Sequence, residues 1–464
     1  MQRAAVADWD EASARWGVLA IGGGWPASRL QGWRGVALAF PRISGHEWLE
    51  EMGEMQKITL DLLTEAARPG WASCLRSVTE LEPAAGEQAS VAPAKFASTR
   101  RGETRGEYAY ESRFLNGESA TAVIIDSKQS QLNRCEAELT KAIADGHPLL
   151  ARLPRIEVTY TRDGIDETYS DVTLPHRAFD GHIRAGSVGD RPVTQLDMYR
   201  ALRNATPANA RALLEASPVS LIFGGWDSSR SARQGRWRSA LVGEIIGFCA
   251  DREPALRGGA RVDPVGMQVR LTGVKLKEIA EAQRAELSRG LYEKATKPAA
   301  KKAKEDKGDL LISASMLGLG GIPPSLDALS GVACHKITRS HVLSFATLRQ
   351  MRFGAGPEGD AACRALLAAL ALNALARSDS ELYLRASCDL RESGPSVVDI
   401  DQRGGGRLAL DPLTIDEADA LLVAALAEAG AKAGITWNGV VLRVAGNPAI
   451  AAGAVAYEDE PGND

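Results

Sequence analysis

Residues 121–146 read TAVIIDSKQSQLNRCEAELTKAIADG, and this stretch decides the fold class. TAVIID has the apolar and β-branched composition of a buried strand. Four apolar residues of the next segment fall on one helical face: Leu132, Cys135, Leu139 and Ile143. Asp126 or Ser127 can cap this helix, and the Asp-Gly pair at 145–146 provides a stop. The sequence therefore predicts a strand that leads directly into an amphipathic helix.

Segments downstream extend this pattern. IEVTYTRDGIDETYSDVTL (156–174) predicts a β-hairpin that turns at Asp163-Gly164. VSLIFGG (219–225) predicts a buried strand, and ALVGEIIGFCA (240–250) predicts a largely apolar helix.

The last third of the chain mixes both kinds of element. CHKITRSHVLSF (334–345), ELYLRAS (381–387) and GVVLRVA (439–445) predict strands. The apolar run at 365–376 is shorter than the ~20 residues of a membrane span, so it predicts a buried helix. Irregular alternation with a hairpin and long insertions favours an α+β fold over a doubly wound parallel sheet.

The first 55 residues form a Trp-rich N-terminal extension of unknown role, because they hold five of the nine tryptophans. Either they are a small accessory module, or they are upstream sequence joined to a chain that begins naturally near Met55. Residues 56–456 form the main domain, in which a Lys-rich segment near 294–308 predicts a mobile insertion. Residues 457–464 are an acidic tail.

Composition restricts the function classes. The 464 residues are 45% hydrophobic and 25% charged, as in an ordinary soluble globular protein. The formal net charge of −4 argues against coating nucleic acid through bulk positive charge, so a nucleic-acid surface must be local. Six scattered cysteines without a CxxC pair predict free thiols in a reducing cytosol, and hence a cytoplasmic protein.

Motifs of catalysis are largely missing from the sequence. It contains no GxxxxGK[ST] and no HExxH, and its six histidines form no i, i+4 pair. LGLGGIPPS (317–325) resembles a phosphate loop superficially, but Pro323-Pro324 favours a tight connection. The sequence therefore predicts no cofactor, no metal and no catalytic residue.

A basic loop, WDSSRSARQGRWRSA (226–240), is the first segment that suggests binding. Its arginines are Arg230, Arg233, Arg236 and Arg238, with Trp237 embedded among them. Guanidinium groups bind phosphates through paired donors and stack on bases. The loop is also expected to lead into a helix N-terminus, which favours anions. An ordinary solvated loop would explain the composition equally well.

The second such segment is DSKQSQLNR (126–134), where the predicted strand meets its helix. Four side chains there could reach one phosphate or ribose: Ser127, Lys128, Gln129 and Ser130. Capping explains Asp126 and Ser127 equally well, but it does not explain the whole run.

Five blocks of sequence, in order, resemble one known family. They are VIIDSKQSQLNRCEAEL (123–139), PHRAFDGHIR (175–184), LIFGGWDSSRSARQGRWRSALVGEIIG (221–247), LGLGGIPPS (317–325) and ITRSHVLSFATLRQMRF (337–353). Together they resemble the RAMP-superfamily backbone subunit of type I-G (formerly I-U) CRISPR Cascade surveillance complexes. The likeness runs from about Lys57 to the acidic tail. It departs at LGLGGIPPS, where the family more often has a polar residue before Ile-Pro-Pro.

The resemblance implies an RRM-like, ferredoxin-like sheet core with large insertions, described as palm, fingers and thumb. It also implies a non-catalytic subunit that binds guide RNA and polymerises along the spacer of the CRISPR RNA. The partners would be CRISPR RNA, further copies in a helical filament, other Cascade subunits and target DNA through the guide, with no membrane. The alternative is a RAMP ribonuclease that cuts guide precursor or target RNA, with Asp126 and Asp227 as conceivable candidates.

The RNA-binding residues expected on this basis come from three segments. They are Ser127, Lys128, Gln129, Ser130, Asn133, Arg134, His176, Arg177, Arg230, Arg233, Arg236 and Arg238.

Overall fold

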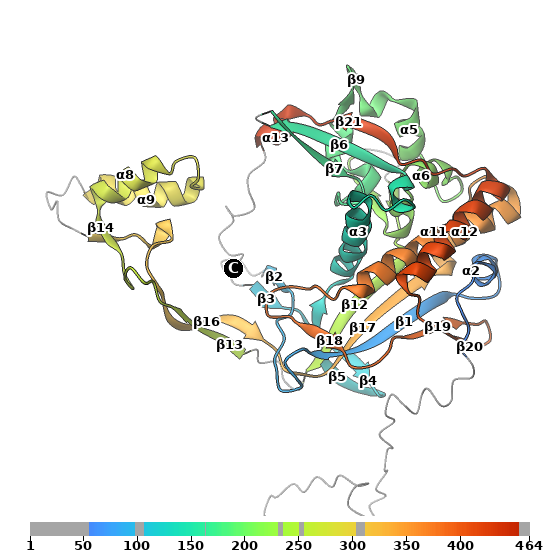
Figure 1. Cartoon of the computed structure of the whole chain (residues 1–464), viewed down its shortest axis with the longest axis horizontal. Helices are drawn as coiled ribbons and strands as arrows, with labels where there is room; N and C mark the ends of the chain where they lie inside the picture. Colours follow the sequence, from blue (N-terminus) through green and yellow to red (C-terminus); the bar gives the residue numbers. More distant parts are fainter. Residues whose placement is uncertain are drawn as a thin grey trace, which may run out of the picture. The chain divides into compact units, whose positions relative to one another are not determined.

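The computed structural model describes residues 55–97, 106–162, 164–230, 235–249, 255–302 and 311–453 (Figure 1). The chain divides into two units, Met1–Glu51 and Met52–Asp464, and all the elements below belong to the second. Residues 1–54, most of the predicted N-terminal extension, and the acidic tail lie outside the described residues.

The central sheet has a recognisable strand order. Its four middle strands are β1 (Cys74–Pro83), β12 (Leu241–Cys249), β17 (Cys334–Ser344) and β19 (Val397–Asp401). They lie in the order β19-β1-β17-β12, and each neighbouring pair is antiparallel. Helix α3 (Lys128–Ala144) precedes β12, and α11 (Gly356–Ser380) follows β17. This β-α-β-β-α-β succession with strand order 4-1-3-2 is the ferredoxin-like arrangement.

Additional strands widen this core at both edges. β5 (Glu118–Asp126) pairs with β12, and β4 (Tyr110–Leu115) pairs with β5. At the other edge, β20 (Arg407–Leu410) pairs with β19, and β18 (Leu390–Glu392) pairs with β1. The short strands β2 (Lys95–Ala97) and β3 (Gly106–Tyr108) form a separate pair. The predicted α+β class is confirmed.

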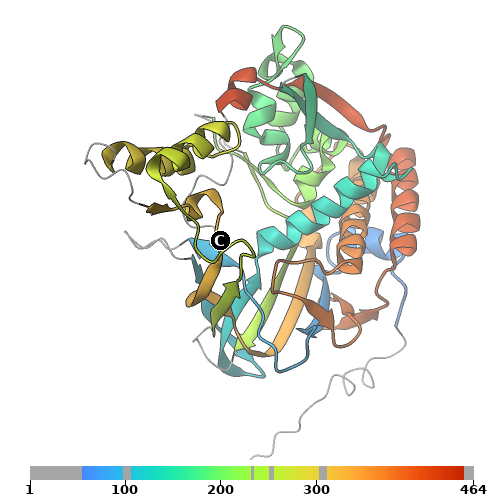
Figure 2. The same ribbon diagram turned by 60° about the vertical axis from the view of Figure 1, so that its left-hand side comes forward.

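Helices cover one face of this sheet, as both views show for α3 and α11 (Figures 1 and 2). The others that pack there include α2 (Leu60–Ala67), α10 (Phe345–Leu348) and α12 (Ile415–Ala433). Within the described residues, α11 has the length and apolarity of a membrane span, but 94% of its most apolar window is buried inside the protein. It is a core helix of this fold.

A buried histidine marks the sheet–helix interface. His341 of β17 is 2% exposed, and its ring lies against Gly243 of β12, where an added Cβ would come within 2.0 Å of the ring. Burial, together with the charge of nearby Arg339, lowers the pKa of His341 to about 3. Gly243 is therefore required by close packing rather than by its backbone angles.

A long insertion between α3 and β12 builds a second sheet. Its strands are β6 (Arg155–Arg162), β7 (Ile165–Ser170), β8 (Ser187–Val188), β9 (Arg191–Pro192) and β21 (Val440–Ala445), in the order β7-β6-β21-β8-β9. β21 comes from the C-terminal end of the described chain and pairs in parallel with β6. The predicted 156–174 hairpin is β6 and β7.

Short elements complete this insertion. The helices are α4 (Gly181–Arg184), α5 (Asp197–Arg203), α6 (Arg211–Ala216) and α7 (Pro218–Ile222). After them, β10 (Gly225–Asp227) and β11 (Gly235–Trp237) form a two-stranded hairpin that leads into β12. Helix α13 (Pro448–Gly453) follows β21.

The insertion between β12 and β17 is here called the arm. β13 (Ala255–Arg261) pairs with β16 (Ile322–Gly331), and between them lie β14 (Arg270–Thr272), α8 (Gly273–Ala282), α9 (Arg289–Lys302) and β15 (Leu311–Ser313). Residues 294–302 of the Lys-rich segment belong to α9, and residues 303–308 lie outside the described residues.

Three predicted elements are wrong. Residues 219–222 belong to α7, because Pro218 begins a short helix there, and residues 223–224 connect it to β10, which begins at Gly225. Residues 241–249 are strand β12, so the basic loop leads into a strand and has no helix N-terminus behind it. Residues 381–387 contain no strand, and Tyr383 is 82% exposed.

Candidate nucleic-acid interface

The start of α3 exposes a small polar surface. Ser127 is the N-cap, and its hydroxyl accepts a hydrogen bond from the Ser130 amide at 3.3 Å. The side chains of Lys128, Gln129 and Asn133 are exposed. The Lys128 ammonium lies 3.9 Å from the carboxylate of Glu244, which also binds Arg113. Capping therefore accounts for Ser127, while Lys128 supplies the exposed positive charge.

Arg134 points into the protein instead. Its guanidinium donates to the fully buried carboxylate of Asp126 at 3.0 and 3.3 Å. Gln131 donates to the same carboxylate at 2.6 Å, and Arg385 is hydrogen-bonded to it. Burial raises the pKa of Asp126, but the hydrogen bonds of Arg134 and Gln131 and the charge of Arg385 outweigh this and lower it. Arg134 therefore stabilises the junction of β5 and α3.

Arg177 joins two segments that are far apart in sequence. Its guanidinium binds the buried carboxylate of Glu136 on α3, with one hydrogen bond of 2.9 Å. It also donates to the Gly224 carbonyl at 3.0 Å, just before the β10–β11 hairpin. His176 precedes it and is exposed. The structure thereby brings together the α3 segment, residues 175–184 (here called the His-Arg segment) and the basic loop.

The basic loop is in large part a hairpin with two different faces. Trp226 pairs with Arg236, and both side chains are exposed. Their neighbours Asp227 and Trp237 point inward, and Trp237 is only 7% exposed. Because side chains alternate along strands, the hairpin presents one tryptophan to solvent and buries the other. Arg238 is also exposed, and Arg233 lies outside the described residues.

The inward face anchors the hairpin. Arg203 of α5 donates to both carboxylate oxygens of Asp227, at 2.7 and 3.0 Å. Burial raises the pKa of Asp227, but hydrogen bonds and charge from Arg203 outweigh this and hold it below its usual range. Arg230 donates to the Arg203 carbonyl at 3.0 Å and to the Asn204 side chain at 2.7 Å.

Glycines make this anchoring possible. Gly224 has a φ of +90°, and an added Cβ would lie 2.9 Å from the Trp237 carbonyl oxygen. At Gly225 an added Cβ would lie 2.9 Å from the ring of Phe179. Gly224 is therefore required for the close approach of the two ends of the hairpin, and Gly225 for the packing of the hairpin against Phe179.

Three exposed side chains meet on the outward face, here called the Trp226 cluster. The Arg236 guanidinium carbon lies 5.9 Å from the centre of the Trp226 ring. The His176 ring centre lies 6.3 Å from that of Trp226, at an interplanar angle of 77°. Trp226 is the residue that sequence reasoning missed. The sequence shows an aromatic residue between a glycine and several arginines, but it does not predict that Trp226 pairs with Arg236 across a hairpin.

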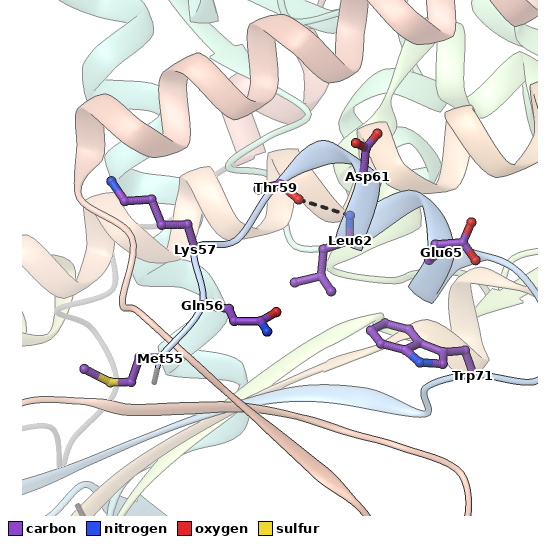
Figure 3. A pocket seen from close by; sticks show the side chains of 8 residues that line it. All are labelled: Met55, Gln56, Lys57, Thr59, Asp61, Leu62, Glu65 and Trp71. Carbon is purple, nitrogen blue, oxygen red and sulfur yellow. Dashed lines mark hydrogen bonds between the residues drawn. The ribbon is translucent and has the colours of Figure 1, made fainter. Parts of the chain in front are cut away.

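The described chain also has a pocket away from this cluster. It has a volume of about 670 Å³ and is lined by residues around the start of α2, including Lys57, Asp61 and Trp71 (Figure 3). The Thr59 hydroxyl in this group is occupied as the N-cap of α2, where it accepts from the Leu62 amide at 3.2 Å. This pocket carries none of the predicted RNA-binding residues.

Comparison with known protein families places part of the chain. Residues 75–252 match the family model described as CRISPR-associated protein GSU0053. The matched segment runs from β1 to the end of β12 and contains all the candidate residues above. It identifies a CRISPR-associated protein family, which supports a role in CRISPR defence and suggests interaction with CRISPR RNA and other CRISPR-associated proteins. A search of curated proteins finds no match.

Proposed function

We propose that this chain is a non-catalytic guide-RNA-binding backbone subunit of a type I CRISPR interference complex. The premise is that residues 75–252 match a CRISPR-associated protein family. Copies of the chain polymerise along the spacer of the CRISPR RNA and present it for pairing with target DNA. The observation that carries the proposal is that the family-matched segment also holds the exposed cationic residues Lys128, Arg236 and Arg238.

Binding of this kind uses local charge. The chain has a net charge of −4, so phosphate contacts must come from a restricted surface. Contacts to phosphate and ribose fix register without reading sequence, which suits a protein whose specificity resides in a guide.

The hydrogen bonding of the Asp126 and Asp227 carboxylates supports a non-catalytic role over a ribonuclease. A catalytic base must be able to reach and accept a proton from the reacting hydroxyl. Both oxygens of Asp126 and both oxygens of Asp227 accept hydrogen bonds from arginine. The structural role of these hydrogen bonds is therefore sufficient to explain why both carboxylates are present.

The test is purification of the chain together with its partner subunits and a CRISPR array, followed by extraction of bound nucleic acid. We expect protected RNA of uniform, spacer-related length in a multi-copy assembly. A nucleic-acid-free monomer that also does not bind added guide RNA would refute the proposal.

Two variants sharpen this experiment. Arg236→Ala combined with Arg238→Ala should reduce the amount of bound RNA. Arg407→Ala is the matched control, because Arg407 is exposed on β20 at the opposite edge of the central sheet and its loss should leave bound RNA unchanged. Cleavage of RNA by the wild type that disappears in Asp227→Asn would favour the ribonuclease instead.

A further inference from the structure

Trp226 is exposed in a way that its fold does not require. Its side chain is 49% exposed, whereas Trp237 and Trp437 are buried and Trp71 is partly buried. These four are the tryptophans of the described residues. Tryptophan is enriched at surfaces that contact a ligand or partner, because it combines a large apolar ring with a polar N–H group.

The neighbours of the ring favour a particular ligand. Arg236 lies at 5.9 Å from the ring centre, near the outer limit of ~6 Å for a cation–π contact, so this contact is weak. His176 approaches at 77°, with its plane nearly perpendicular to the indole. A flat aromatic ring beside a cation and a second aromatic group suits a nucleobase with its adjoining phosphate.

The backbone that carries the Trp226 ring is anchored on both sides. The side chain of Asp227, the next residue, accepts two hydrogen bonds from Arg203, and the carbonyl of Gly224, two residues before Trp226, accepts one from Arg177. Because the backbone on both sides is fixed, little conformational entropy is lost when a ligand stacks on the side chain.

We propose that Trp226 stacks an unpaired RNA base, that Arg236 binds an adjoining phosphate, and that His176 borders the base. The inference rests on the proposed RNA-binding function and assigns its base-contacting residue. The site accepts any base, since stacking requires only an aromatic face. It selects single strands, because a paired base inside a duplex has both faces covered by its neighbours.

The test compares RNA binding by wild-type full-length protein and by Trp226→Ala, Trp226→Leu and Trp226→Phe. Two probes of equal length are used: an oligouridine strand and a strand of abasic ribose-phosphate units. On oligouridine, Trp226→Ala should bind about tenfold more weakly, the size expected for one stacked base. Trp226→Leu keeps an apolar side chain without an aromatic face, so it should also lose affinity. Trp226→Phe should retain most of it.

On the abasic strand, wild type and Trp226→Ala should bind equally. The dependence of affinity on salt should be unchanged in Trp226→Ala, because stacking releases no counterions, whereas Arg236→Ala should reduce it. Thermal unfolding of each variant serves as the folding control.

Several outcomes would overturn the inference. The first is that Trp226→Leu binds oligouridine with full affinity. The second is that Trp226→Ala loses as much affinity for the abasic strand as for oligouridine. The third is that Trp226→Ala keeps its RNA affinity but no longer retains a partner protein in ribonuclease-treated complexes. The last result would make the Trp226 cluster a protein contact. Failure of the wild type to bind either probe would instead refute the RNA-binding function itself.

Discussion

The start of α3 and the β10–β11 hairpin have similar compositions but expose different chemistry. Arg134 of α3 is bound by the buried Asp126, so one cation, Lys128, remains exposed in the first two turns. In the hairpin, the buried Asp227 is bound by Arg203 from another helix, and Arg236 stays exposed. An arginine near a suspected binding site is available to a ligand only when no buried carboxylate of the fold binds it.

The largest expected effect is at Asp126. Asp126→Ala leaves Arg134 and Arg385 facing each other without a counterion, which should lower the free energy of unfolding by about 3 kcal/mol. Asp227→Ala should cost less, because Asp227 anchors a short hairpin rather than the junction of β5 and α3. Urea unfolding of both variants measures the difference, and equal losses would remove the contrast between the two regions.

The salt dependence of RNA binding sharpens the same contrast. Alanine at Arg230, Arg233, Arg236 and Arg238 should reduce the slope of log affinity against log salt by about 0.7 for each phosphate that the variant no longer binds. Lys128→Ala should reduce it by about 0.7 at most. Titrations at several salt concentrations measure both slopes. An unchanged slope in the loop variant would refute the assignment of these arginines as phosphate contacts. A larger change in Lys128→Ala would mean that the start of α3, rather than the hairpin, provides most of the phosphate contacts.

A pair of glycines tests whether the hairpin is the more tightly built region. Gly224→Ala combines a φ of +90° with a Cβ 2.9 Å from the Trp237 carbonyl oxygen, and should destabilise the protein by about 2 kcal/mol. Gly146→Ala, after α3, has a φ of +77° with nothing within 4 Å, so it should cost about 1 kcal/mol. Thermal unfolding compares them, and an equal cost would show that the close approach at Gly224 is easily relieved.

The last prediction concerns the scaffold that both regions share. His341 has a folded-state pKa of about 3 against an ordinary value of 6.5, so the unfolded chain binds the extra proton between these pH values. Stability from this group is therefore present above pH 6.5 and is lost as the pH falls toward 3. His341→Asn should remove about one proton from the pH dependence of unfolding. An unchanged pH dependence would mean that another group titrates there.

Much of the fold could be predicted from periodic segments. The strand at 121–126, its capped helix, the 156–174 hairpin and the apolar α11 are where the sequence indicates. The errors at 219–225 and 240–250 share one cause, because both are short apolar runs without a clear period. The second half of β12 is buried on both faces, Ile245 against Val123 and Ile125 on one side and Ile246 with Phe248 on the other. A strand covered on both sides shows no alternation, so it resembles a buried helix.

The candidate site could be predicted by segment but not by side chain. Whether Arg177 faces solvent depends on a carboxylate and a carbonyl contributed by distant elements. Glu136 is 41 residues from Arg177 in sequence, and Gly224 is 47 residues away. The orientation of Trp226 depends on hairpin register, which a loop sequence does not specify.

The parallel pairing of β21 with β6 also has a consequence for biosynthesis. Val440 pairs with Arg155, so 285 residues (440 minus 155) separate the partners. At roughly 5–20 residues per second, a ribosome needs on the order of 15–60 s to make the second partner after the first. During that time β6 has one missing neighbour, so its edge is available to chaperones or to aggregation. The sheet beside the candidate interface is therefore among the last parts of the protein to be completed.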